Sequence, residues 1–267
     1  MKEIISKTII TKSKLPNVEW VLNPYVGCTT GCSYCYARFM GRFTGHGQDK
    51  WGTYVDWKSN AVELLKKEAP KIKKKGGIVL LGSVTDSYQP LEKKLKLTRE
   101  ILKVLLENQI PISILTKSDL ILRDIDLLEK FDYCEVGISL GTYSNEYKIF
   151  ESRASSHIER INVLKMMYKK GNIKTYAFVG PIHPFISKME DIFHEFYNYV
   201  DFAMGEIINL KCGNTEDVVA SLQKNSSISV SEYFQIAKSD DFFNQNLNLF
   251  DSLCLKYNIP NKGFFKH

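Results

Sequence analysis

The sequence of 267 residues lacks the features that mark membrane-spanning and secreted proteins. It has no run approaching the roughly eighteen apolar residues that a membrane-spanning helix needs. Its N-terminal segment, MKEIISKTIITKSK, has no continuous apolar stretch of the kind found in secretory signals. The six cysteines do not make a secreted disulfide scaffold in a chain of this length. We therefore expect a cytoplasmic protein that does not enter a membrane.

The sequence also lacks a proline-, glycine- or serine-rich linker that would divide it into separate domains. Its residues are 44% hydrophobic and 25% charged, as in ordinary soluble globular proteins. The net charge is +6, and lysine-rich runs at 71–75 and 93–96 supply much of it. A basic surface is compatible with a nucleic-acid substrate, although each run taken alone is typical of a solvated helix face. We expect a monomer.

Three of the cysteines are close together in the stretch Asn23–Tyr36, NPYVGCTTGCSYCY. Cys28, Cys32 and Cys35 are spaced C-x3-C-x2-C, and the other three cysteines are far away in the sequence. A structural zinc site has four ligands, commonly in C-x2-C pairs, so this trio fits such a site poorly. Thiolates also hold iron–sulfur clusters, and a cubane held by three cysteines keeps one iron free for another ligand. The spacing therefore favours an iron–sulfur cluster.

Strand and helix patterns alternate along the first 210 residues. Short apolar runs predict strands at 18–22, 78–81, 112–115, 135–140, 175–179 and 202–208. Helical spacing predicts helices at 59–69 (with Pro70 beyond the end), 91–106, 119–131, 156–170 and 187–199, the last opened by a capping box of Ser187 and Glu190. Repeated βα units imply a parallel sheet with right-handed crossovers. We predict an α/β fold, a partial (β/α)6 TIM-like barrel over residues 1–210.

Two segments depart from this alternation. Residues 43–56 are rich in glycine and aromatic residues and predict an irregular excursion. From residue 211 the strand pattern ends, and helical spacing at 229–238 and 242–257 predicts a short helical C-terminal extension. We expect this extension, residues 211–267, to pack on the barrel as a second unit.

Candidate site residues follow the predicted strands at the ends where barrel enzymes carry their chemistry. A lysine at the mouth of a strand is well placed to bind a carboxylate, whereas hydroxyl groups there are equally often part of the core. Two histidines on predicted helix faces, His157 and His194, are expected at the surface. The candidates are Ser83 and Thr85 after the second strand, Lys117 after the third, Ser139 in the fourth, and Ile182 and His183 after the fifth.

Four motifs together resemble one protein group. The sequence NPYVGC with GCSYCYAR, the turn SVTDSYQP, the segment LTKS and the acidic–basic run Arg123–Asp126 are similar to the spore photoproduct lyase-like group of radical S-adenosylmethionine proteins. This group is often labelled DNA repair photolyase, and the similarity covers roughly residues 18–210. The resemblance implies that Cys28, Cys32 and Cys35 hold a 4Fe-4S cluster, with Tyr34 in the aromatic position before the last cysteine.

The resemblance also implies an activity and its cofactor. The open iron would bind S-adenosylmethionine, whose reductive cleavage yields a 5′-deoxyadenosyl radical that abstracts hydrogen from a substrate. An external electron donor of flavodoxin or ferredoxin type is implied as a partner, and nucleic acid is one candidate substrate. By the same resemblance, Lys117 pairs with the carboxylate of S-adenosylmethionine, Thr85 and Ser139 lie near the same ligand, and Ile182 with His183 lies at its adenine end.

One residue departs from the pattern of the lyase. The lyase has a cysteine at the turn after the second strand, where it donates hydrogen to the product radical, and this sequence has Ser83. A serine O–H bond is much stronger than a thiol S–H bond, so we expect that this chain is not a true spore photoproduct lyase. Cys212, just past the last predicted strand, is the candidate for an alternative hydrogen donor.

Two other classes of function compete with this interpretation. A non-catalytic iron–sulfur electron carrier or redox sensor would reduce its cluster without producing 5′-deoxyadenosine, and it gives no reason for Lys117. A zinc-dependent nucleic-acid-binding protein would contain zinc and be colourless. Counting iron and sulfide after anaerobic purification separates the zinc-dependent protein from both iron–sulfur classes, the radical enzyme and the electron carrier.

Overall fold

The computed structural model describes residues 1–47 and 50–266. Its centre is an eight-stranded sheet with the order β11-β10-β9-β8-β7-β6-β3-β2. All neighbouring strands are parallel except β2 and β3, which are antiparallel, and among the described residues β11 and β2 are the two edge strands. The strands are β2 (Ile10–Lys12), β3 (Trp20–Leu22), β6 (Val79–Leu81), β7 (Ile112–Thr116), β8 (Cys134–Ser139), β9 (Lys174–Ile182), β10 (Phe202–Ile207) and β11 (Asn261–Phe265).

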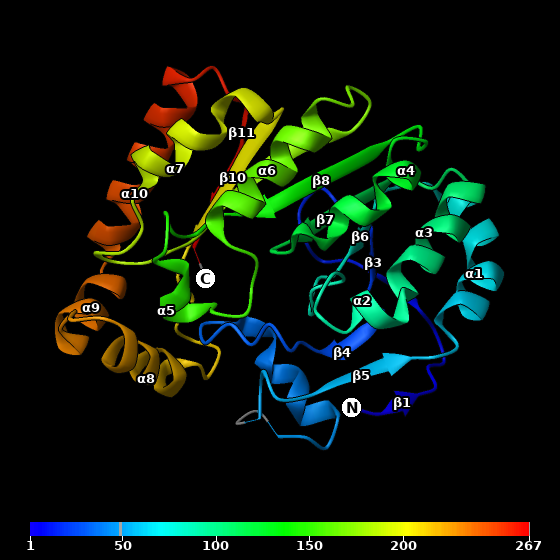
Figure 1. Cartoon of the computed structure of the whole chain (residues 1–267), viewed down its shortest axis with the longest axis horizontal. Coiled ribbons are helices and arrows are strands. Elements are labelled where there is room, and N and C mark those ends of the chain that lie inside the picture. Colours follow the sequence, from blue (N-terminus) through cyan, green and yellow to red (C-terminus); the bar gives the residue numbers. More distant parts are fainter. Residues whose placement is uncertain (48–49, 267) are drawn as a thin grey trace.

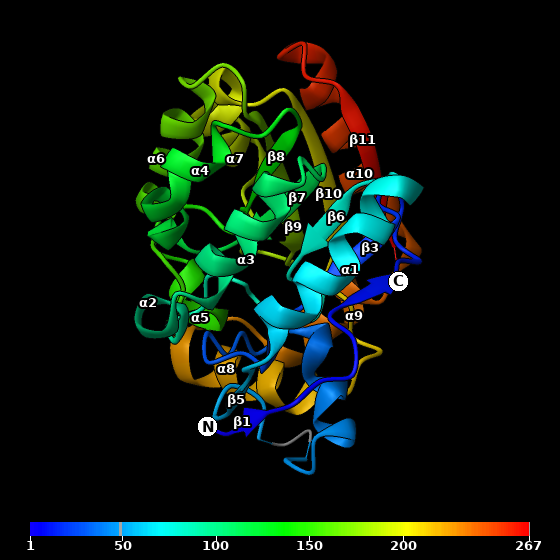
Figure 2. The ribbon, with the colours of Figure 1, turned by 90° about the vertical axis from the view of Figure 1, so that its right-hand side faces the viewer.

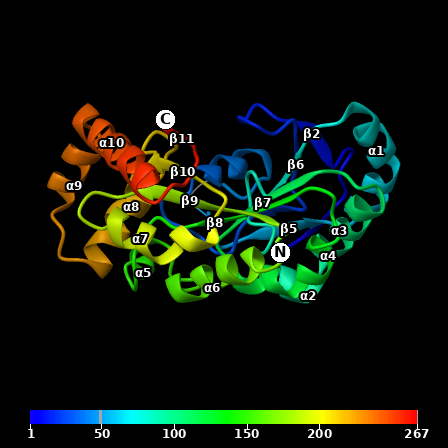
Figure 3. The ribbon, with the colours of Figure 1, turned by 90° about the horizontal axis from the view of Figure 1, so that it is seen from above.

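The six predicted strands are confirmed as β3, β6, β7, β8, β9 and β10, and the partial barrel is confirmed with them. They could be recognised because parallel strands are buried on both faces and read as apolar runs. Leu81 pairs with Ile114 in the register of β6 and β7, and both side chains are fully buried. Helices lie outside the curved sheet, where α6 contacts β8 and β9, and α7 contacts β9 (Figures 1 and 3).

The helices of the barrel differ in detail from the prediction. They are α1 (Ala61–Lys75), α2 (Glu92–Leu95), α3 (Leu97–Glu107), η2 (Asp119–Asp124), α4 (Ile125–Leu128), α5 (Tyr147–Phe150), α6 (His157–Tyr168), α7 (Met189–Phe196) and η3 (Tyr197–Tyr199). Pro70 lies inside α1 instead of beyond its end, because its exposed ring removes only one hydrogen bond of a long helix. The expected helix at 91–106 is broken at Lys96, which has φ +53°.

The capping box expected at Ser187 is wrong. The Ser187 hydroxyl accepts from the His183 N–H at 2.9 Å and donates to the Gly141 carbonyl, so it fixes the loop after β9. Lys188 is the N-cap of α7 and makes no side-chain capping bond. The tertiary contact of this serine replaces the local one that the sequence pattern indicated.

A second, three-stranded sheet lies beside the barrel and leads into the cysteines. Its order is β1-β5-β4, formed by β1 (Glu3–Ile4), β5 (Val55–Lys58) and β4 (Tyr25–Gly27). The excursion expected to be irregular therefore ends in a strand, β5, which pairs with β4 and β1. Between the cysteines and this strand, a 3-10 helix, η1, spans Tyr36–Phe43.

The C-terminal segment contains α8 (Thr215–Asn225), α9 (Val230–Ala237), α10 (Asp240–Lys256) and β11. The prediction that strands end before residue 211 is wrong, because β11 pairs in parallel with β10 at the edge of the main sheet. Phe264 of β11 packs over Gly205 of β10, where any added Cβ would lie 2.7 Å from its ring. None of the helices in the described part of the chain is long and apolar enough to cross a membrane.

Candidate active site

The three clustered cysteines lie in one loop, residues 28–35, which we call the cysteine loop. It follows β4 and is held from three sides by segments distant in the sequence. The Gln89 side chain accepts from the Thr29 N–H at 3.0 Å, and the Phe150 carbonyl accepts from the Ser33 N–H at 2.9 Å. The Asn214 amide donates to the Tyr34 carbonyl at 2.6 Å. Figures 1 and 2 show α8, just after Asn214, beside the blue segment that contains this loop.

Two glycines allow the loop to approach its neighbours closely. Gly27 has φ +85°, and a Cβ there would lie 2.6 Å from the Tyr54 carbonyl oxygen. Gly31 has φ +61°, and a Cβ there would lie 2.0 Å from a guanidinium nitrogen of Arg153. Both backbone conformations favour glycine, so a substitution at either position would displace the loop.

Cys28 and Cys32 of the cysteine loop are buried, and the half-buried Cys35 packs against the clusters that contain each of them. Burial and the neighbouring Cys28 thiol raise the pKa of Cys35 to about 12, against the opposing charge of Lys117. Burial and the charge of Glu151 raise the pKa of Cys32, and Lys117 again opposes the rise. The three thiols and the Lys117 ammonium group therefore occupy one region of the molecule.

This donor set suits a cluster better than a single ion. Within residues 1–47 and 50–266, no three or more histidine, cysteine or carboxylate side chains are arranged to hold one metal ion. A cubane makes a different demand, because each cysteine binds a different iron and the thiols need not meet at one point. Three neighbouring thiols in a short loop, two of them buried and one half-buried, fit that demand by their chemistry.

A buried ion pair fixes the side of the loop that faces the barrel. The Tyr34 hydroxyl donates to Glu151 at 2.6 Å, and Arg160 donates to the other oxygen of the same carboxylate. Arg160 also donates to the Ser139 carbonyl at 3.1 Å, which ties the pair to the end of β8. Although burial acts to raise it, the charges of Arg160 and Lys117 hold the pKa of Glu151 below its usual value.

The structure brings Lys117, Ser139 and Tyr34 together. The Lys117 ammonium donates to the Ser139 hydroxyl and lies 5.6 Å from the centre of the Tyr34 ring. Ser139 in turn donates to the Gly180 carbonyl at 2.9 Å. In the described part of the chain, Lys117 makes no ion pair with a carboxylate. Thr85 is buried beneath the loop, where its hydroxyl donates to the Gly27 carbonyl at 2.7 Å.

His183 is enclosed by aromatic residues at the end of β9. Its ring stacks on Phe150 with centres 4.1 Å apart, and its Nδ1 lies 2.6 Å from the Tyr233 hydroxyl. Burial lowers the pKa of His183 to about 3, so the imidazole is neutral at physiological pH. Among the described residues its Nε2 has no hydrogen-bond partner. Ile182, the residue before it, is buried in the main core.

The two candidates for hydrogen donation lie in different places. The Ser83 hydroxyl accepts from the Asn23 amide at 3.0 Å, and the Ser83 carbonyl accepts from the hydroxyl of Tyr36. The half-buried Cys212 thiol donates to the Asn209 carbonyl at 3.4 Å. Asn214, two residues after Cys212, donates to the Tyr34 carbonyl, so the fold brings this part of the tail to the cysteine loop.

Sequence reasoning missed several residues of this site. Arg160, Asn214 and Tyr233 carried no local signal, because their partners are distant in the chain; Asn214 and Tyr34 are 180 residues apart. The expectation that His157 lies at the surface is wrong. His157 opens α6, and its side chain is buried. Its Nδ1 lies 3.1 Å from the Thr142 carbonyl oxygen.

Comparisons with known proteins identify the family. Residues 22–196 match the model of the radical SAM superfamily, so the chain belongs to that superfamily. Membership implies a 4Fe-4S cluster and S-adenosylmethionine as cofactors. An uncharacterized protein of Methanocaldococcus jannaschii is 36% identical over 266 residues, which cover 99% of this chain and 97% of the relative.

Solved structures of spore photoproduct lyase variants are similar in fold. One variant with dinucleoside spore photoproduct has a TM-score of 0.73 at 14% identity. The match covers 99% of this chain and 81% of the lyase chain. Another variant, with bound AdoMet and dinucleoside spore photoproduct, has a TM-score of 0.71 at 14% identity. That match covers 98% of this chain and 80% of the lyase chain. The fold is therefore the partial barrel of spore photoproduct lyase.

Proposed function

We propose that this chain is a radical S-adenosylmethionine enzyme whose 4Fe-4S cluster is held by Cys28, Cys32 and Cys35. The cluster, when bound, would supply the electron for reductive cleavage of S-adenosylmethionine to a 5′-deoxyadenosyl radical, which abstracts hydrogen from a substrate. The observation that carries the proposal is the group of three neighbouring thiols, two of them buried and one half-buried, with the Lys117 ammonium group over the Tyr34 ring in the same loop. An electron carrier would need the thiols but not the lysine.

The residues around the thiols supply the groups that S-adenosylmethionine requires. Lys117 binds the carboxylate, because its ammonium group is half-buried and has no carboxylate partner in the described part of the chain. Ser139 holds this ammonium group in place, and Thr85, which already donates to Gly27, offers acceptor capacity to the same ligand. Tyr34 forms the wall beneath Lys117.

At the other end of the site, His183 and Ile182 bind the adenine portion. The neutral His183 ring is fixed by Tyr233 and leaves Nε2 for a ligand hydrogen bond. Ile182 supplies apolar surface at the end of β9. Enclosure by Phe150 and Tyr233 excludes water from this end, which strengthens each polar contact made there.

The experiment that tests the proposal is anaerobic reconstitution. The protein should hold one four-iron cluster, and S-adenosylmethionine should change its electron paramagnetic resonance spectrum. Changing any one of the three cysteines to alanine should abolish that signal. A colourless protein containing zinc would overturn the proposal, and a mutant that retained the signal would remove that cysteine from the ligand set.

We further propose that the reaction is not the repair of spore photoproduct, because Ser83 cannot readily quench a carbon radical. Wild type, Ser83→Cys and Cys212→Ala are incubated with a spore-photoproduct dinucleotide, dithionite and S-adenosylmethionine. We expect 5′-deoxyadenosine without release of thymidylyl-thymidine by the wild type. Efficient release by the wild type would contradict this, and its loss in Cys212→Ala would identify the tail cysteine as the hydrogen donor.

A further inference from the structure

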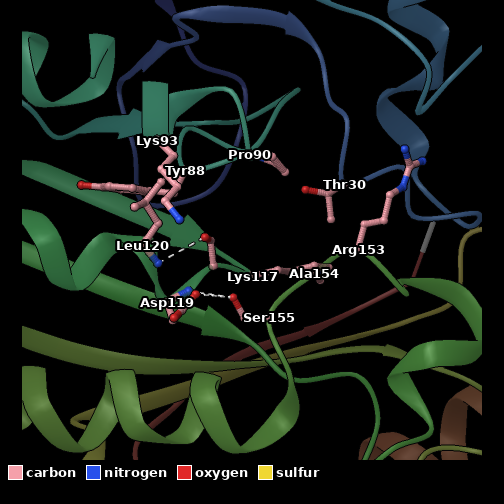
Figure 4. A pocket seen from close by; sticks show the side chains of 11 residues that line it. Thr30, Tyr88, Pro90, Lys93, Lys117, Asp119, Leu120, Arg153, Ala154 and Ser155 are labelled. Atoms are coloured by element: carbon pink, nitrogen blue, oxygen red, sulfur yellow. Dashed lines mark hydrogen bonds between the residues drawn. The ribbon is translucent and has the colours of Figure 1, made fainter. Parts of the chain in front are cut away.

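A cationic pocket lies beside the cysteine loop at the carboxyl end of β7. Its volume is about 340 Å³, which is at the lower end of the range for ligand sites. Figure 4 shows Thr30 and Arg153 on one side of it, Lys93 and Tyr88 on the other, and Asp119 with Ser155 along its base. The lining residues are Thr30, Tyr88, Pro90, Lys93, Lys117, Ser118, Asp119, Leu120, Arg153, Ala154 and Ser155.

The pocket carries an excess of positive charge that the described residues do not neutralise. Lys93, Lys117 and Arg153 are its cations, and Asp119 is the one carboxylate among the lining residues. None of the three cations forms an ion pair in the described part of the chain. Arg153 donates to the Gly52 carbonyl at 2.9 Å, and Asp119 accepts from the Ser155 hydroxyl at 2.7 Å. A concave surface of this kind attracts anionic groups.

Lys117 takes part in both the pocket and the candidate cofactor site. The ammonium group of Lys117 points to Ser139 and the Tyr34 ring, which belong to the cofactor side. The Lys117 carbonyl accepts from the Ser155 N–H at 3.2 Å, which builds the wall of the pocket. Thr30, which lines the pocket, lies between Cys28 and Cys32 in the cysteine loop. The pocket therefore adjoins the cysteine loop at Thr30, and we call this side of the loop its outer side.

We propose that this pocket docks the acidic surface of a one-electron carrier protein. Carboxylates of the carrier pair with Lys93 and Arg153, which places its redox group against the outer side of the cysteine loop. There the carrier is oxidised by one electron, and that electron enters the centre held by the three cysteines. The inference rests on the proposed function, because an electron must be delivered before S-adenosylmethionine can be cleaved.

The position of the pocket favours a protein reductant over a nucleic-acid substrate. A substrate must approach the side where Lys117 and His183 enclose the cofactor, since hydrogen is abstracted there. An electron donor needs only proximity to the thiols. A carrier in the pocket would contact Thr30, which lies between Cys28 and Cys32 in the cysteine loop. Nucleic-acid phosphate would find the same cations, so its binding is a separate outcome of the test.

The test compares two reductants on the reconstituted enzyme. Lys93→Glu reverses one pocket charge, and Arg153→Gln removes another. Lys71→Glu makes the matched change on an exposed position of α1, outside the pocket. Formation of 5′-deoxyadenosine is measured with reduced flavodoxin over a range of concentrations and with dithionite, and flavodoxin binding is titrated directly at low salt.

Lys93→Glu should raise the flavodoxin KM and weaken the titrated binding by about tenfold or more, and it should flatten the salt dependence. The rate with dithionite should stay within about twofold of wild type, because a small reductant needs no docking, and Lys71→Glu should resemble wild type with both reductants. Arg153→Gln should also weaken flavodoxin binding, and this variant is judged by the direct titration alone, because the Arg153 guanidinium also donates to Gly52 and lies against Gly31 of the cysteine loop.

Three results would overturn the docking proposal. They are unchanged flavodoxin binding in both variants, an equal loss of rate with both reductants in Lys93→Glu, and a weaker affinity for a single-stranded oligonucleotide with flavodoxin binding intact. Failure of the proposed function is distinguishable from all three. In that case wild type forms no 5′-deoxyadenosine even with dithionite, while the direct titration still reports whether flavodoxin docks at Lys93.

Discussion

The two sides of the cysteine loop differ in whether their charged side chains form ion pairs. On the side that faces the barrel, Glu151 and Arg160 are 1% and 2% exposed, and each is hydrogen-bonded to the other and to neighbouring groups. On the outer side, Lys93 and Arg153 line an open pocket and form no ion pair among the described residues. The inner charges are compensated by each other, whereas the outer charges have no carboxylate partner among the described residues, although Arg153 also donates to the Gly52 carbonyl.

Desolvation explains this difference. An ion removed from water must be compensated by a partner in good geometry, so a buried charge is held in one arrangement. An exposed cation keeps its hydration and its rotamer freedom until a partner binds. The inner side can therefore position a cofactor, and the outer side suits reversible contact. Four substitutions test this contrast.

Arg160→Met should produce the largest effect, because it leaves the Glu151 carboxylate buried without its main partner. We expect unfolding free energy to fall by about 3–5 kcal/mol in urea titrations. Lys170→Met removes a half-exposed pair with Glu129 and should cost less than about 1 kcal/mol. A loss in Arg160→Met as small as that in this control would mean that the inner side does not depend on the pair.

Lys117→Ala should weaken S-adenosylmethionine binding while leaving the iron content intact. A hydrogen bond to a charged group contributes about 1.5–3 kcal/mol, which corresponds to about ten- to a hundredfold in affinity. Lys93→Ala, on the outer side, should leave that affinity unchanged. Equal affinity in wild type and Lys117→Ala, measured by equilibrium titration, would remove Lys117 from the cofactor site.

The buried His183 should make stability depend on pH. The folded-state pKa is about 3 and the unfolded value about 6.5, so both states carry a neutral imidazole above pH 6.5. Below pH 6.5 the unfolded chain gains a proton that the folded chain does not, and stability falls toward pH 3. The loss from this residue should be about 2 kcal/mol at pH 5.

His183→Gln should lack this part of the pH dependence. The measurement is the unfolding free energy of apo wild type and variant at pH 7.5 and pH 5. Between pH 7.5 and pH 5 the unfolding free energy of the variant should fall by less than that of wild type. Parallel pH profiles would show that the imidazole is not kept neutral in the folded protein.

Asn214→Ala should have the smallest effect of the four, because it removes one amide that holds the cysteine loop from the tail. The net loss should be about 1 kcal/mol, with faster release of iron to a chelator. Asn225→Ala removes a comparable but exposed bond to the Ile149 carbonyl, and it should change stability by less than about 0.5 kcal/mol. Identical iron release in both variants would argue against a role for the tail at this loop.

The partial barrel was predictable and the end of the chain was not. The apolar run that forms β6 is bounded by glycines, with Val79 and Leu81 fully buried and Leu80 half-buried, so its pattern alone identifies a strand. The segment of β11, NKGFF, has no alternation and includes a glycine. It becomes a strand because β10 offers a free parallel edge and Gly205 makes room for Phe264.

The boundaries of the helices also depend on tertiary contacts that the local sequence pattern does not reveal. Propensity places a helix over 91–106, but Lys96 takes a left-handed conformation and separates α2 from α3. The physical cause is Glu92, whose carboxylate is buried and accepts from the Thr98 N–H at 2.9 Å across that break. A contact of this kind leaves no periodic pattern in the sequence.

The sequence by itself determined the set of cysteines, the order of the six central strands and the residues that follow them, because each depends on local spacing. The tertiary structure decided which distant residues support that set. Arg160, Asn214 and Tyr233 reach the site only after α6, α8 and α9 have packed. It also separated the enclosed side of the loop from the cationic one, since burial depends on all elements that surround a residue and not on its neighbours in the chain.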